Sequence, residues 1–139
     1  MESSPKPFGE LWSIAENNNY SLDDYTEISA KTKLFLHPEQ IQGSIRGNDL
    51  FEFFKQKEIK TLNASAWEYL KSHPNLIPEM WKFGSSGGAQ YIFFWGTIDR
   101  SPEGNLSVRY ISWSGGNWVF SYYLLSGNWH EDFPAVIFE

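Results

Sequence analysis

The chain has 139 residues, no cysteine, and a formal charge of −6 from 17 acidic and 11 basic residues. This length suits one domain that buries about two-thirds of the surface its unfolded chain exposes. A chain without cysteine has no disulfide, no zinc–thiolate site and no thiol nucleophile. Lys and Arg are too sparse for a basic footprint, so no nucleic-acid partner is expected.

The sequence contains no signal for export or membrane insertion. Residues 1–10 lack the basic start and apolar stretch of a secretory signal, and the longest nearly uninterrupted apolar run, 91–96, is too short to cross a bilayer. We therefore expect a cytoplasmic protein with no membrane partner.

The N-terminal half is expected to be mainly helical. Residues 1–9 contain prolines and predict a loosely ordered lead-in, followed by a short helix over 10–17 that the asparagines at 17–19 end. Ser21 could cap a second short helix, although the segment 33–36 fits a strand equally well.

Two later helices have clearer signals. In 49–57, Leu50, Phe53 and Phe54 recur at helical spacing, with lysines near the C-terminal end. Asn63 is a good N-cap for a helix over 64–72, whose apolar stripe includes Trp67. A further turn is expected after Pro78.

Beyond residue 82 the sequence predicts strands. Segments rich in β-branched and aromatic residues cover 91–100, 105–114, 117–125 and 135–138. Gly115-Gly116 fits a two-residue hairpin turn, and Pro102-Glu103-Gly104 fits a type I turn with a glycine bulge. The predicted fold class is α+β: one domain over 1–139, with short helices in 10–82 packed on a three- to four-stranded antiparallel β-meander in 91–138.

The predicted turns fix which side chains share a sheet face. With Ser101 paired to Asn105, Phe93 is expected opposite Trp113 and Trp95 opposite Ile111. Strand alternation then predicts one face with Phe93, Trp95, Ile111, Trp113, Trp118, Phe120 and Tyr122, and another with Phe94, Ile98, Leu106, Val108, Tyr110, Val119, Tyr123 and Leu125. Both faces are apolar, so either the chain covers both or part of the Trp/Tyr face is a binding platform.

The candidate binding residues lie on that Trp/Tyr face: Trp95, Arg109, Trp113, Trp118 and Tyr122. Arg109 has two interpretations. It could stack on Tyr122 and pair with Asp99, which is the interpretation we favour, or it could recognise an anionic group of a partner.

Five C-terminal segments resemble a block found in a family of uncharacterised bacterial proteins, common in candidate-phylum genomes. They are Asn-Leu-Ile-Pro-Glu-Met-Trp-Lys at 75–82, Phe-Phe-Trp-Gly-Thr-Ile at 93–98, Gly-Asn-Leu-Ser-Val-Arg at 104–109, the Trp-Ser-Gly-Gly-Asn-Trp hairpin at 113–118, and Pro-Ala-Val at 134–136. The resemblance implies a bacterial origin and a reusable β-module, and it assigns no activity or site.

Signatures of catalysis are missing from the sequence. The three histidines have no metal-ligand spacing, and Gly-x-Ser-x-Gly and phosphate-loop motifs are absent. Asp99 with Glu103, or Glu131 with Asp132, could supply a carboxylate pair at a sheet edge, as in glycosidases. We expect no catalytic residues, metal or cofactor.

The functional hypothesis is a non-catalytic bacterial interaction module that binds a macromolecule through an aromatic sheet face or edge. Another protein is the favoured partner. The alternatives are a small glycan-binding or glycan-hydrolysing domain, and an acidic immunity or anti-defence protein that blocks a basic enzyme surface. The sequence leaves the oligomeric state open.

Overall fold

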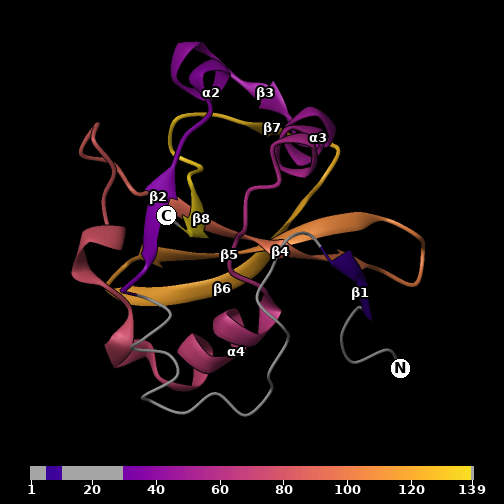
Figure 1. Ribbon diagram of the computed structural model, residues 1–139. Helices are drawn as coiled ribbons and strands as arrows, with labels where there is room; N and C mark the ends of the chain where they lie inside the picture. Colours follow the sequence, from indigo (N-terminus) through magenta and orange to yellow (C-terminus); the bar gives the residue numbers. More distant parts are fainter. Residues whose placement is uncertain (1–5, 11–29, 139) are drawn as a thin grey trace.

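Figure 1 shows a computed structural model of the chain, which describes residues 6–10 and 30–138. The fold is α+β, with a mostly antiparallel sheet between helices. The strand order is β2-β8-β4-β5-β6, and β1 also pairs with β4. Helix α3 lies on one side of this sheet and α4 on the other, so both faces are covered by the chain (Figure 1).

Helix α4 begins where the sequence signals predict, whereas α3 begins two residues before the predicted Asp49 and has Arg46 as its N-cap. Helix α3 spans Gly47–Lys57 and α4 spans Ala64–Ser72, with the Asn63 side chain accepting hydrogen bonds from the backbone of Ser65 and Ala66. A shorter helix, α2, spans Pro38–Gln42, and 3₁₀ turns follow at η1 (Pro74–Leu76) and η2 (Glu79–Trp81).

The strands of the main sheet are β1 (Lys6–Glu10), β2 (Thr32–Phe35), β4 (Tyr91–Arg100), β5 (Leu106–Ser114), β6 (Asn117–Leu124) and β8 (Ala135–Phe138). Strands β3 (Ile45–Arg46) and β7 (Asn128–Trp129) form a separate small pair. Strand β8 runs parallel to β4 and antiparallel to β2, so it does not continue the predicted antiparallel meander.

The N-terminal predictions need correction. Lys6–Glu10 forms β1 instead of a loose lead-in, and Thr32–Phe35 is a strand, which decides between the two alternatives left open for 33–36. The helix expected over 10–17 and the one expected at Ser21 lie outside the described residues, apart from Glu10, which belongs to β1. The main sheet therefore has more strands than the predicted three or four.

The β5–β6 hairpin has the predicted register. Trp113 lies opposite Trp118, and their ring centres are 5.0 Å apart. Gly115 and Gly116 have φ angles of 60° and 83°, which only glycine adopts readily and which fit a two-residue turn between twisted strands.

The β4–β5 register is where the predicted face assignment was wrong. Near the turn Ile98 pairs with Val108 as expected, but Phe94 pairs with Arg109, so Trp95, Gly96 and Thr97 form an insertion in β4. Their backbone and side chains turn to another segment: Gly96 donates to the carbonyl of Leu62, and Thr97 Oγ1 accepts from the amide of Ala64. An insertion of three residues reverses the side-chain alternation, because that alternation has a period of two.

As a result, the two faces exchange residues. Phe93 and Trp95 belong to the α3-side core with Phe54 and Trp129, whereas Phe94 joins Ile111 in the α4-side core. Phe93 lies opposite Tyr110 instead of Trp113. The start of α3 lies so close to the segment after β6 and to β7 that a Cβ on Gly47 would collide with the Leu125 carbonyl oxygen and the Trp129 ring.

Replacing Trp67 tests the α4-side core. The side chain is 2% exposed and its Nε1 donates to the Tyr110 carbonyl at 3.0 Å. Trp67→Ala is expected to lower the free energy of unfolding by about 3–5 kcal/mol, because it leaves a cavity in this core. Urea denaturation followed by circular dichroism measures this loss. Ile41→Ala on exposed α2 is the control and should change stability by less than about 0.5 kcal/mol; equal midpoints for the two variants would place Trp67 outside the core.

Candidate functional site

The candidate site lies along β6, an edge strand of the main sheet. We call it the β6 surface and define it as the outer edge of β6 together with the partly accessible rings of Trp113, Trp118, Phe120 and Tyr122. These rings extend from the α4 side of the sheet, beyond the part that α4 covers. Tyr122 is 36% exposed, and Val119 on the opposite side of β6 is 37% exposed.

The hydrogen-bond pattern of the β5–β6 pair leaves half of the β6 backbone directed outward. The amide of Leu125 donates to the carbonyl of Leu106, so this pair belongs to the hydrogen-bonded set. In an antiparallel ladder such pairs alternate along the strand, which places Val119 and Ser121 in the same set. The N–H and C=O groups of Trp118, Phe120 and Tyr122 therefore point away from β5. Within residues 6–10 and 30–138, no strand pairs with this outer edge.

Two tryptophans form the end of the β6 surface near the hairpin turn. Trp113 and Trp118 pack edge to face, which is a favoured arrangement for aromatic rings. Lys82 Nζ lies 3.9 Å from the centre of the Trp113 ring and forms a 2.8 Å ion pair with Glu79. This end of the surface therefore combines apolar rings with an ion pair.

An ion-pair network supports the other end. Arg109 Nε and Nη2 donate to the two carboxylate oxygens of Asp99 at 2.8 and 3.2 Å, and Nη1 donates to Glu68 at 3.1 Å. The guanidinium also lies 4.7 Å from the centre of the Trp67 ring and 5.5 Å from that of Tyr122. Arg109 thus holds Tyr122 in place and pairs with Asp99, as in the interpretation favoured from the sequence.

Burial and charge act in opposite directions at this network. Burial lowers the pKa of Arg109, but the hydrogen bonds and negative charge of Asp99 outweigh it and hold that pKa above its usual value. Burial raises the pKa of the Tyr122 hydroxyl, although the charge of Arg109 opposes this rise. Both groups therefore keep their usual protonation at neutral pH, with Arg109 charged and the Tyr122 hydroxyl neutral.

The predicted binding residues do not all meet on one surface. Trp113, Trp118 and Tyr122 share the β6 surface, and Arg109 lies buried behind it at 5% exposure. Trp95 is fully buried on the α3 side, where the centre of its ring lies 5.0 Å from that of Trp129, and it is excluded from the site. The cause is the insertion in β4, which moves Trp95 to the opposite face.

Residues missed as site residues lie in β6 itself. Phe120 was placed on the right face but not in the site, and Val119 contributes exposed apolar surface on the other side of the edge. The sequence signal was available: Asn-Trp-Val-Phe-Ser-Tyr-Tyr-Leu contains no charged residue and no proline, the features by which natural edge strands avoid pairing.

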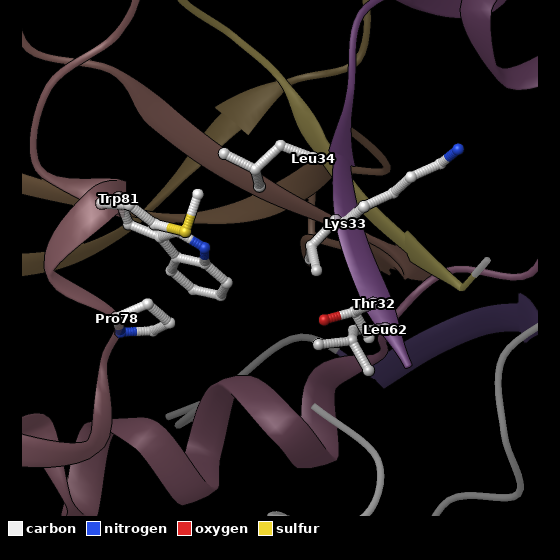
Figure 2. A pocket seen from close by; sticks show the side chains of 8 residues that line it. Thr32, Lys33, Leu34, Leu62, Pro78 and Trp81 are labelled. Carbon is white, nitrogen blue, oxygen red and sulfur yellow. The ribbon is translucent and has the colours of Figure 1, made fainter. Parts of the chain in front are cut away.

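Apart from the β6 surface, a groove lies between β2 and η2 (Figure 2). Trp81 and Pro78 line one side, Leu34 and Leu62 line the other, and the volume is about 390 Å³. In Figure 2 the ammonium group of Lys33 points away from the Trp81 ring. The groove can accept an apolar group and presents mainly hydrocarbon, so it offers little for acid–base chemistry.

Asp99 and Glu103, one of the carboxylate pairs considered for catalysis, do not share a site. Asp99 is fully buried and bound by Arg109, whereas Glu103 is exposed in the β4–β5 turn. Among the described residues, no group of three His, Cys, Asp or Glu side chains could hold a metal ion. The helices within 30–138 include none that is long and apolar enough to span a membrane.

Comparison of the chain with protein-family models, with curated proteins and with solved structures finds no match. The resemblance of 75–136 to bacterial proteins therefore stays a prediction, and the geometry of the site carries the functional argument alone.

Replacing Arg109 tests the network behind the β6 surface. Arg109→Leu leaves Asp99 buried without this cation, and removing one partner of a buried ion pair costs about 3–5 kcal/mol of unfolding free energy. Glu68→Gln removes the exposed partner of the same Arg109 and should cost less than about 1 kcal/mol. Chemical denaturation at neutral pH compares the two, and equal small losses would show that the Asp99 pair is not sequestered from water.

Proposed function

We propose that this domain is a non-catalytic protein-interaction module that binds its partner by strand addition at the outer edge of β6. The observation that carries the proposal is the outer edge of β6, with which no strand among residues 6–10 and 30–138 pairs. It has eight residues without charge or proline, whose alternate backbone groups point away from β5. An extended segment of another protein can satisfy these donors and acceptors, as in other cases of β-augmentation.

The composition of the edge argues that pairing is its role. A sheet edge presents an unpaired row of N–H and C=O groups, and proteins usually protect it with charged side chains, prolines, bulges or a covering segment. Strand β6 has a regular eight-pair register with β5 and uses none of these side-chain devices. Keeping such an edge costs solubility, and a partner that covers it explains why it is tolerated.

The rings beside the edge add specificity to backbone pairing. Trp118, Phe120 and Tyr122 occupy every second position of β6, so their side chains project from the same face of the sheet. A strand added at this edge can contact them on that face. Tryptophan and tyrosine provide large contact area with few rotatable bonds and are enriched among residues that dominate binding energy. The Arg109–Asp99 pair behind Tyr122 limits the motion of that ring, which reduces the entropy lost on binding.

A lysine placed on the edge tests the proposal. Val119→Lys puts a charge in the middle of β6 at an exposed position, so folding should be preserved while strand addition is opposed. Tagged protein is incubated with lysate of a bacterium that also expresses the untagged chain, and captured proteins are quantified by mass spectrometry. We expect at least one protein, the chain itself included, to be retained by the wild type and reduced about tenfold by Val119→Lys, which corresponds to ~1.4 kcal/mol.

Ile41→Lys is the matched control for this experiment. Ile41 is 60% exposed on α2 and lies outside the main sheet, so the substitution adds the same charge to another apolar surface position. The captured proteins should be the same as for the wild type. If Val119→Lys and Ile41→Lys capture the same set in the same amounts, the β6 edge is not the binding surface.

A further inference from the structure

We infer that the occupant of the β6 edge is a second copy of this chain, whose own β6 pairs antiparallel about a two-fold axis at Phe120. This inference rests on the proposed function and specifies its partner. The result is a continuous sheet that crosses from one copy to the other, with the two copies using the same surface.

Within β6, the side-chain pattern from Trp118 to Tyr122 is symmetric about Phe120. Reading outward in both directions, a small or aliphatic residue (Val119 or Ser121) is followed by a large aromatic residue (Trp118 or Tyr122). When two copies of β6 pair antiparallel about Phe120, a residue that precedes Phe120 faces the residue that follows it at the same separation in the other copy. Centring on Phe120 therefore sets ring against ring, with Trp118 opposite Tyr122 of the other copy.

The backbone supports the same register. Trp118, Phe120 and Tyr122 direct their N–H and C=O groups to the open edge, so each can form a hydrogen-bonded pair with a residue of the same set in the other copy. Val119 then faces Ser121 across the dimer as a non-hydrogen-bonded pair, on the α3 side of the sheet. Both side chains are small enough to meet without displacing the strands.

The charge distribution also fits a second copy. Each chain carries a formal charge of −6, which opposes association of copies through most surfaces, but β6 itself is uncharged. Lys82 lies over Trp113, the neighbour of Trp118, and Glu68 binds Arg109, the neighbour of Tyr122. Lys82 is already paired with Glu79 and Glu68 with Arg109, so antiparallel pairing brings two internally neutralised ion pairs to the same side.

The register can be tested by cross-linking, because the chain has no cysteine to compete. Val119→Cys and Ser121→Cys variants are prepared separately, one with a size tag, then mixed and oxidised with glutathione disulfide. In the inferred dimer, position 119 of one copy faces 121 of the other at a Cα separation of about 4.5 Å, which a disulfide can span. We expect a disulfide-linked heterodimer on a non-reducing gel from the mixture.

Each variant alone is the control. Two copies of position 119 are diagonal neighbours, about 7–8 Å apart, which is beyond the usual reach of a disulfide, and the same holds for two copies of 121. Cross-linked product from Val119→Cys alone would overturn the register. Product in equal amounts from both single variants and from the mixture would show random collision and would also overturn the register. A wild-type chain that sediments as a monomer up to about 1 mM would overturn the dimer itself, because that limit corresponds to a free energy of association weaker than ~4.1 kcal/mol.

The outcome separates this inference from the proposed function. If the mixture gives no heterodimer while other captured proteins still depend on Val119, the β6 edge binds a different protein and self-pairing is wrong. If no captured protein depends on Val119 and no cross-link forms, both the function and the partner are wrong.

Discussion

The insertion of Trp95, Gly96 and Thr97 in β4 is the constraint on which the rest of the structure depends. These residues leave the β5 register and are held by Leu62 and Ala64, at the start of α4. The insertion therefore ties helix α4 to the central strand and reverses the side-chain alternation within one strand. Because of that reversal, β4 can supply Phe93 and Trp95 to the α3-side core and Phe94 to the α4-side core.

This arrangement explains why β6, and not the centre of the sheet, is available for binding. Both central faces are covered, so the large rings of β4 stabilise the domain instead of contacting a partner. Helix α4 packs over β5 through Trp67, whose ring contacts Phe120 and Tyr122 at centre separations of 5.7 and 5.9 Å. The rings of β6 are thus supported from behind by α4 and by Arg109, while their outer sides remain accessible.

Sequence reasoning succeeded where the cause of a feature is local. The Asn63 cap and the Gly115-Gly116 turn are set by the conformational preferences of a few adjacent residues, and both were placed correctly. The Arg109–Asp99 pair was also predicted, although Arg109 lies just beyond the pairs that keep the predicted register and faces Phe94 instead of Thr97. Sequence reasoning failed at Trp95, since the insertion depends on contacts with Leu62 and Ala64, about thirty residues away, which no pattern within β4 reveals. The parallel placement of β8 beside β4 is a long-range effect of the same kind.

The open edge of β6 gives the clearest physical link between sequence and function in this molecule. A charged residue at the exposed Val119 position could have protected this edge without loss to either core, because Val119 belongs to neither core cluster. The strand instead carries aromatic residues at each outward backbone position, from Trp118 to Tyr122. Hydrogen bonds gained at such an edge are individually worth about 1 kcal/mol, so backbone pairing alone gives weak and unselective association. In the proposed pairing, the alternating rings supply the apolar contact that makes one partner strand preferable to another, and their symmetry about Phe120 favours a strand with the same spacing.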